Sequence, residues 1–201
     1  MRDKIDGFVL AGGAGSRMGR DKALVKLCGV TLAERAADRL KAVSENIYIV
    51  GPYRKDIALP IVSDRFETRA SIVGLHSALS NSKTEATAVL ACDLPFASGE
   101  LLKFLAAIYD EEQCDAVVPK QNDGRLQPLC AIYNTADCLA SVEQAIASGD
   151  LRLHAMLEQI DVRYVEPAEI AHLPDSDLFF LNINRPADLD RAAAICERRG
   201  F

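Results

Sequence analysis

The chain has 201 residues, of which 49% are hydrophobic and 26% are charged, and its formal net charge is -6. This length suits one α/β core and is short for two. No apolar run approaches the roughly 20 residues that span a bilayer. The negative net charge disfavours a nucleic-acid surface, which needs an extended basic field. The first residues lack the pattern of a secretory signal, so we expect a cytoplasmic protein.

Cysteines and histidines do not form a recognisable site in the sequence. No CxxC pair occurs, so we expect reduced, mostly buried thiols rather than a zinc site or a disulfide framework. No HExxH or HxH spacing occurs, so a metal cluster or a catalytic triad has little support. The residues concerned are Cys28, Cys92, Cys114, Cys130, Cys138 and Cys196, and His76, His154 and His172.

Short apolar runs rich in valine and isoleucine alternate with segments of helical period. This pattern is typical of parallel strands joined by crossover helices. The predicted strands cover residues 7–10, 46–50, 60–63, 87–91, 115–119, 128–133, 163–165 and 178–183.

Helix signals lie between these strands. The first helix is predicted to begin at Thr31, because Glu34 stands three residues later and completes a capping box. Further helices are predicted over 72–79, from near Ser98, over about 136–148 with Gly149 as the stop, after Asp150, and from Pro186.

The polar turn predicted at 120–125 interrupts the regular alternation, so we expect a mixed, mostly parallel sheet in a single three-layer α/β domain spanning residues 1–201. Ligands of such sheets bind beyond the carboxyl ends of the strands. This rule selects the positions after Leu10, Ser63 and Ala91.

A glycine-rich loop follows the first strand. Four glycines between positions 10 and 19 let the backbone turn sharply and bring N–H groups against phosphate oxygens. From Gly13 to Lys26 four basic residues face one acidic residue, four minus one, which is a local charge of +3. We therefore expect a small anionic ligand, a nucleoside triphosphate. The alternative is a turn without a ligand, and it leaves the clustered glycines and basic residues unexplained.

Two common phosphate-binding motifs do not fit this loop. A dinucleotide fingerprint needs a third glycine where Met18 stands, and the second strand ends at Gly51-Pro52, without a carboxylate for a ribose. A Walker A loop needs Gly-Lys-Ser/Thr, whereas Lys22 is preceded by Asp21 and followed by alanine.

Polar residues follow three of the predicted strands. Asp64 and Asp93 come directly after apolar runs, and carboxylates there can hold Mg²⁺ against phosphate oxygens. For a single aspartate such as Asp64 a turn or capping role is about equally expected. Asn182 and Asn184, two positions apart on a predicted strand, would face one cleft, and their alternative role is to cap the helix at Pro186.

The loop sequence LAGGAGSRMGRDKAL resembles the LAGGxSxRMGxDK signature of the molybdenum cofactor guanylyltransferases, which attach GMP to molybdopterin. The segments ACDLPF at 91–96, QPL at 127–129 and NINRPAD at 182–188 are similar to the CDxPF, QPL and NxNxPxD segments of that family. The resemblance extends over about residues 6–193. Gly12-Gly13 favours this group over relatives with LAAGxGxRM, which load cytidine or uridine nucleotides.

The resemblance implies a Rossmann-like nucleotidyltransferase fold, with a nucleotide-binding half at about 1–95 and an acceptor-binding half at about 96–201. It implies GTP and molybdopterin as substrates, Mg²⁺ as cofactor, and other molybdenum cofactor proteins as further partners. From the net charge and the lack of a long apolar run we expect no nucleic-acid or membrane partner. The implied catalytic residues are Arg17, Lys22 and Asp93. The implied nucleotide-binding residues are Leu10, Ala11, Gly12, Gly13, Gly15, Lys22, Asp64 and Asp93. Asp93 and Asn184 are implied as metal ligands, and Gln127, Asn182 and Asn184 as acceptor-binding residues.

Two departures from the family pattern concern recognition of the base. Ala70-Ser71 stands where many members have Gly-Pro, and Gly51-Pro52-Tyr53 where they have an asparagine. One alternative is therefore a cytidylyltransferase that acts on molybdopterin or another phosphorylated acceptor. A carrier without catalytic activity is a further alternative, disfavoured because a binder has no need of two aspartates beside a phosphate loop.

Overall fold

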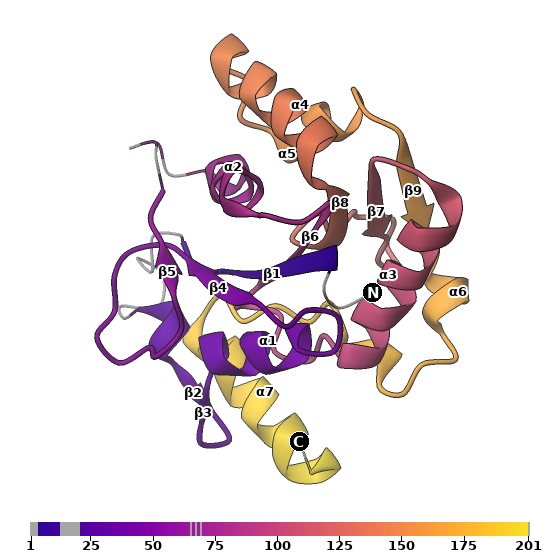
Figure 1. Cartoon of the computed structure of the whole chain (residues 1–201). Coiled ribbons are helices and arrows are strands. Elements are labelled where there is room, and N and C mark those ends of the chain that lie inside the picture. The colour runs from indigo at the N-terminus through magenta and orange to yellow at the C-terminus, as the bar shows by residue number, and fades with distance from the viewer. Residues whose placement is uncertain (1–3, 13–20, 65, 67, 69, 201) are drawn as a thin grey trace.

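A seven-stranded sheet runs through the middle of the protein, and helices cover both of its faces (Figure 1). The computed structural model describes residues 4–12, 21–64, 66, 68 and 70–200. In spatial order the strands are β5 (Ile61–Val62), β4 (Ile47–Val50), β1 (Ile5–Leu10), β6 (Ala86–Ala91), β8 (Cys130–Asn134), β7 (Ala116–Pro119) and β9 (Val162–Val165).

The sheet is mixed, as the sequence predicts. Strand β8 pairs antiparallel with both of its neighbours, β6 and β7, and every other pair is parallel. The carboxyl ends of β1, β4, β5 and β6 therefore lie at one edge of the sheet, where ligands of α/β proteins bind.

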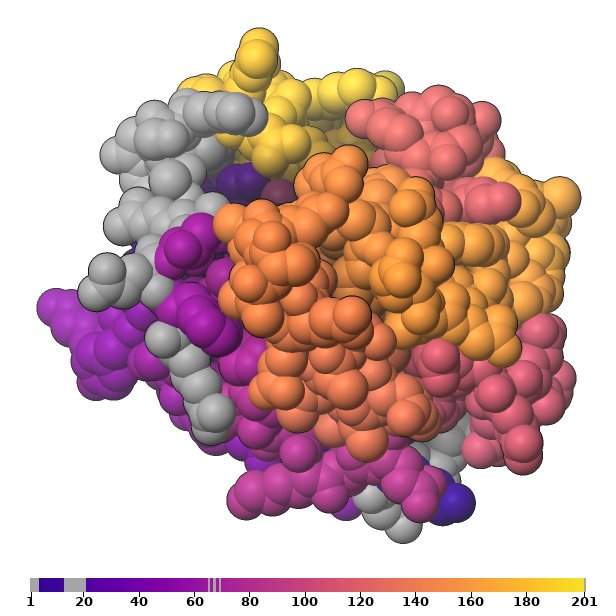
Figure 2. All heavy atoms as spheres, turned by 90° about the horizontal axis from the view of Figure 1, so that it is seen from above, coloured from indigo at the N-terminus to yellow at the C-terminus, as the bar shows by residue number. Residues whose placement is uncertain are grey.

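Three layers make up the domain. Helices α2 (Ser71–Asn81), α4 (Thr135–Ser148) and α5 (Leu153–Leu157) cover one face, and α1 (Leu32–Leu40), α3 (Gly99–Glu112), α6 (Pro167–Ile170) and α7 (Pro186–Arg199) lie on the other (Figure 1). Figure 2 looks onto the first face, where the orange atoms of α4 lie beside the magenta of α2. All residues of β1 and β6 are buried, as expected for strands covered on both faces. Phe8 packs in the α2 side of the core, and its neighbour Val9 packs in the α1 side.

Helix boundaries follow the predicted local signals. Thr31 caps α1, and Glu34 completes the capping box. The Ser98 hydroxyl caps α3 by accepting from the backbone N–H of Leu101. Gly149 ends α4 in the left-handed conformation, and Pro186 opens α7.

The predicted strand at 178–183 is wrong. The chain forms a short 3-10 helix, η4 (Ser176–Leu178), and then runs without regular structure through residue 184. Phe179 and Ile183 are fully buried in the core between the sheet and α7. The run is apolar because it fills this layer, and a short apolar run does not by itself distinguish a strand from a buried irregular segment.

Two short strands, β2 (Lys26–Leu27) and β3 (Val30–Thr31), form a hairpin that the sequence pattern does not predict. Cys28 and Gly29, its two turn residues, both have positive φ, at 50° and 84°, as this kind of tight hairpin turn requires. The predicted polar turn at 120–125 is confirmed, because Lys120 bridges to Leu126 across it.

All six cysteines lie in the described part of the chain, and none forms a disulfide. Five are buried and Cys28 is exposed, which agrees with the prediction of mostly buried thiols. Among the helices in the described ranges, none is both long and apolar enough to cross a membrane.

Candidate active site

The chain leaves β1 at the carboxyl edge of the sheet, between the ends of two neighbouring strands. The backbone N–H of Ala11 donates to the Val50 carbonyl of β4 at 2.9 Å, and that of Cys92 donates to the Leu10 carbonyl at 3.2 Å. These bonds fix the start of the glycine-rich loop beside the segment that carries Asp93. Three residues named from the sequence, Gly13, Gly15 and Arg17, lie outside the described residues.

Lys22 brings two predicted site residues together. Its Nζ lies 3.0 Å from Oδ2 of Asp93 and 2.9 Å from Oδ1 of Asn184. The side chains of Lys22 and Asp93 are 23% and 25% exposed, so the ion pair is partly open to a ligand. We refer to Lys22, Asp93 and Asn184 as the lysine cluster. In Figure 2 indigo atoms from the start of the chain lie in a recess beside yellow atoms from its C-terminal part.

The backbone holds Asn184 in place within this cluster. The N–H of Ile183 donates to the Asp93 carbonyl at 2.9 Å. The N–H groups of Asn184 and Arg185 both donate to Oδ2 of Asp188, each at 2.8 Å. These two bonds hold the pKa of the Asp188 carboxyl below its usual value. Asp188, the third residue of α7, thus binds the backbone of the N-cap residue Arg185 as in a capping box, and the side chain of Asn184 is left to face Lys22.

The alternative in which the asparagines cap α7 is therefore wrong for Asn184. The strand from which we expect Asn182 and Asn184 to face one cleft does not form, so their spacing no longer supports that expectation. The amide of Asn182 donates to the Phe180 carbonyl at 3.3 Å, in its own loop. A spacing of two residues places side chains on one side only when the backbone is a strand.

Asp64 lies beside the beginning of the glycine-rich loop. Its Oδ2 is 3.6 Å from the point that a Cβ on Gly12 would occupy. Its Oδ1 accepts the hydroxyl of Ser77, on α2, at 2.9 Å. Helix α2 has no side-chain cap, so Asp64 does not serve as one. Its expected contact with a nucleotide stays a prediction.

Gln127 lies at the same edge of the sheet, just before β8. It is nearly buried, and its backbone N–H donates to the Pro119 carbonyl at 2.9 Å. No hydrogen bond within the described ranges joins Gln127 or Asn182 to the lysine cluster. The expected acceptor-binding roles of both residues stay predictions.

Arg54, in the loop after β4, is a site residue that no sequence motif singles out. Its side chain is 6% exposed. Its Nε donates to Oδ2 of Asp21 at 2.6 Å, and its Nη2 donates to Oδ1 of Asp21 at 3.1 Å and to the Ala11 carbonyl at 2.8 Å. One arginine in a loop carries no periodic or motif signal, so only the folded structure reveals it.

The cysteine next to Asp93 is buried. Burial, together with the neighbouring Asp93 carboxylate, raises the pKa of the Cys92 thiol to about 12. A thiol with this pKa stays protonated near neutral pH. The polar groups that the lysine cluster offers to a ligand are two side-chain oxygen atoms and one ammonium group.

The lysine cluster has the chemistry of a cation site. A carboxylate oxygen and an amide oxygen converge on one ammonium group, and Mg²⁺ prefers the same oxygen donors. In the described ranges no three His, Cys, Asp or Glu side chains form a metal cage. Mg²⁺ does not need one, because one or two carboxylates plus substrate phosphates commonly hold it.

Comparison with known proteins shows the family of the chain. Residues 7–164 match the model of the MobA-like NTP transferase domain. The chain is 31% identical over 196 residues to a protein of Desulfosudis oleivorans named molybdenum cofactor guanylyltransferase, with 96% of each chain covered.

Two solved structures show the same fold. One is molybdopterin-guanine dinucleotide biosynthesis protein A of Archaeoglobus fulgidus, with a TM-score of 0.83, 30% identity, and coverage of 96% of this chain and 99% of that one. The other is 2-C-methyl-D-erythritol 4-phosphate cytidylyltransferase of Thermus thermophilus, with a TM-score of 0.71, 16% identity, and coverage of 97% and 100%. The second likeness concerns the fold alone. The predicted α/β nucleotidyltransferase fold is confirmed, and the chain belongs to the MobA-like NTP transferase family.

Proposed function

We propose that this protein transfers GMP from GTP to the terminal phosphate of molybdopterin and releases pyrophosphate. The observation that carries the proposal is the lysine cluster, in which Lys22, Asp93 and Asn184 meet at the carboxyl edge of the sheet. The names of the D. oleivorans and A. fulgidus relatives support the choice of guanine and of a molybdopterin acceptor.

The reaction joins a phosphate oxygen of the acceptor to the α-phosphorus of GTP, and the bond from that phosphorus to the bridging oxygen of the β-phosphate breaks. A phosphate monoester is already anionic at neutral pH, so the acceptor needs no general base. The protein contributes position and charge. The Lys22 ammonium binds triphosphate oxygens and offsets the negative charge that develops on the leaving pyrophosphate.

The loop residues complete this part of the proposal. Backbone N–H groups from Gly12 to Gly15 and the guanidinium of Arg17 bind the phosphates beside Lys22. Asp64, held by Ser77 next to Gly12, contacts the nucleotide. Gln127 and Asn182 bind the acceptor from the second half of the chain.

Asp93 and Asn184 are the residues that would hold Mg²⁺, because their side-chain oxygens already converge on one cation, the Lys22 ammonium. Bound Mg²⁺ supplies neutralisation of charge on the phosphate oxygens. Asp93 also orients Lys22 through their ion pair. We place the reaction in the cytoplasm and expect delivery of the product to other molybdenum cofactor proteins.

The experiment that tests this function is incubation of the protein with Mg²⁺, molybdopterin and either GTP or CTP, followed by mass analysis of the pterin. A pterin heavier by one GMP unit, formed with GTP and not with CTP, supports the proposal. A CMP adduct would instead assign a cytidylyltransferase, and an unchanged pterin with both nucleotides would contradict nucleotidyl transfer to this acceptor.

A further inference from the structure

Arg54 is a buried charged residue whose contacts reach the lysine cluster through one neighbour. Burying a guanidinium is costly unless its donors are paired. The Arg54 donors find their partners in the Asp21 carboxylate and in the carbonyls of Ala11 and Pro52, the last at 3.1 Å. The arginine therefore ties the end of β1 and the residue before Lys22 to the loop that follows β4.

Asp21 connects Arg54 to the short helix that begins at Lys22. Its Oδ1 accepts the N–H of Ala23 at 3.1 Å and so caps η3 (Lys22–Leu24), a single 3-10 turn. A helix this short has little stability of its own, so its cap and its tertiary contacts decide where it sits. Both Asp21 oxygens bind Arg54, and Lys22 is the next residue in the chain.

The planar shape of the guanidinium lets arginine, and not lysine, bind Asp21 and the Ala11 carbonyl together. The guanidinium donates through Nε and Nη2 to the two oxygens of one carboxylate, and Nη2 also donates to the Ala11 carbonyl. A lysine ammonium keeps the charge but cannot reproduce this planar fork. The substitution Arg54→Lys therefore removes the geometry while it retains the charge.

We propose that Arg54 and Asp21 form a positioning pair that sets the place of the Lys22 ammonium between Asp93 and Asn184. Arg54 acts through Asp21 and η3, and it does not itself touch a substrate. The effect of this pair on catalysis rests on the proposed function, in which Lys22 binds the triphosphate.

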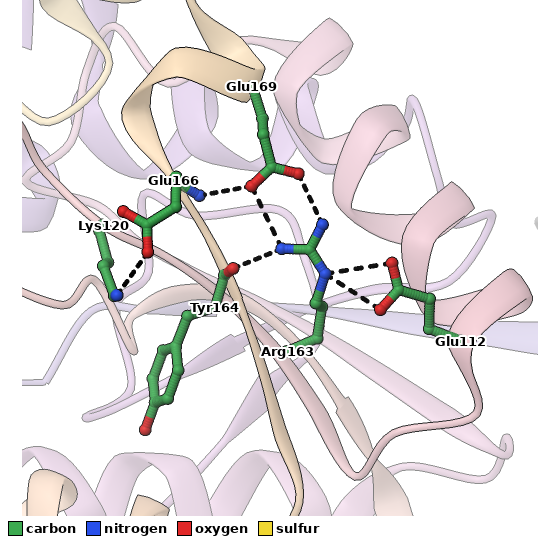
Figure 3. A network of polar contacts seen from close by, with 6 residues as sticks. All are labelled: Glu112, Lys120, Arg163, Tyr164, Glu166 and Glu169. Atoms are coloured by element: carbon green, nitrogen blue, oxygen red, sulfur yellow. Dashed lines mark hydrogen bonds and ion pairs between the residues drawn. The ribbon is translucent and has the colours of Figure 1, made fainter.

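A second arginine network offers a matched control. Arg163 on β9 donates to Glu112 at 3.0 Å and to Glu169 at 2.6 Å, and it also donates to the Tyr164 carbonyl (Figure 3). Like Arg54 it joins carboxylates and a backbone carbonyl, and it fastens the edge strand β9 to α3 and α6. The sheet ends in β5, next to β4, on one side and in β9 on the other. Arg163→Lys therefore removes similar arginine–carboxylate bonds at the end of the sheet away from Lys22.

The direct test is the reactivity of Lys22 toward an amine-acylating reagent, measured by peptide mass mapping in the whole protein without nucleotide. We expect Lys22 to be labelled roughly 3-fold or more faster in Arg54→Lys and in Asp21→Asn, since the ammonium is no longer held against its two oxygen partners. Labelling of Lys22 in Arg163→Lys should match the wild type. An unchanged Lys22 rate in both site variants would overturn the proposal. Asp21→Asn keeps the size of the side chain and provides the test if Arg54→Lys fails to fold.

A double-mutant cycle tests the route through Lys22. Arg54→Lys should lower kcat/KM for GTP by about 10- to 100-fold, the scale of a misplaced positioning group. In a Lys22→Ala background the same change should cost less than about 2-fold, because coupled residues do not add. An equal loss of kcat/KM in both backgrounds would show that Arg54 supports the fold in general, and would contradict the proposal that it acts through Lys22. If the wild type forms no guanylylated pterin but Lys22 labelling still accelerates, the proposed function fails and the positioning pair stands.

Discussion

The Nζ of Lys22 lies 3.0 Å from Oδ2 of Asp93, although 71 residues separate them in the sequence. Asn184, 162 residues beyond Lys22, completes the cluster at 2.9 Å. Three segments meet here because β1 and β6 are parallel neighbours and the loop before α7 binds the backbone of Asp93. The fold therefore assembles the lysine cluster from the beginning, the middle and the end of the chain.

The two asparagines before α7 should behave differently. Asn184→Ala removes an oxygen partner of Lys22 and should weaken binding of Mg·GTP by about 10-fold, the scale of one lost hydrogen bond to a charged group. Asn182→Ala should leave Mg·GTP affinity within about 2-fold of the wild type, because its amide binds the Phe180 carbonyl instead. Calorimetric titration of both variants checks this. Equal losses of Mg·GTP affinity in the two variants would show that the hydrogen bond from Lys22 to Asn184 does not contribute to nucleotide binding.

Gly51→Ala should disturb the support of the glycine-rich loop. Gly51 has φ of +141°, and a Cβ there would lie 3.2 Å from the Ala11 carbonyl oxygen and 3.3 Å from Nη1 of Arg54. We expect a loss of about 1–3 kcal/mol in stability from the strained backbone, and a raised KM for GTP because the clash displaces Ala11 and Arg54.

Gly149→Ala is the control for this variant. Gly149 also has positive φ, at +79°, but nothing lies within 4 Å of its would-be Cβ, and it ends α4 away from the site. It should lower the melting temperature and leave the KM for GTP unchanged. A similar KM in the Gly51 and Gly149 variants would mean that the contact with Ala11 does not matter for binding.

The cap of α7 predicts a pH dependence of stability. The Asp188 carboxylate accepts two backbone N–H groups, which lower its pKa below the ordinary value of 3.8. A carboxyl whose pKa is lower in the folded than in the unfolded state stabilises the fold above the unfolded pKa and loses this contribution as pH falls through the folded one. Asp188→Ala should therefore cost about 1 kcal/mol at pH 7, and the difference from the wild type should shrink below about pH 4.

Urea unfolding at pH 7 and at stepwise lower pH measures this difference. The control is Asp190→Ala on the same helix, since Asp190 is exposed and accepts no hydrogen bond within the described ranges. A difference in the free energy of unfolding between wild type and Asp188→Ala that stays constant down to pH 3 would contradict the stabilising role of the Asp188 carboxylate.

Local signals account for the parts of the fold that the sequence predicts. Thr31 and Glu34 stand at capping-box spacing, and Gly149 follows the last helical residue, so both helix ends follow from neighbours in the chain. The sequence predicts Asp64 and Asp93 as site residues because parallel strands place their carboxyl ends at one edge. The same rule applied to β1 and β6 places Asp93 beside the start of the glycine-rich loop.

Features that depend on distant contacts could not be predicted in this way. The run from Leu178 to Ile183 is apolar because it packs in the core, not because it pairs with a strand. Arg54 is buried with its donors paired to Asp21, Ala11 and Pro52, and its own segment has no apolar period. The orientation of Asn184 depends on Asp188, which takes over the capping role expected of an asparagine.

Release of pyrophosphate during a single turnover, with enzyme in excess over GTP and with Mg²⁺ and molybdopterin present, tests the central claim most directly. In the proposed function Lys22 binds the triphosphate, and Asp93 would hold Mg²⁺ and orients Lys22. Asp93→Asn and Lys22→Ala should each slow the release by about 100-fold or more, the scale of a removed charge-stabilising group, while both variants retain cooperative thermal unfolding. Near-wild-type release in both variants would contradict the assignment of the lysine cluster as the nucleotidyl-transfer site.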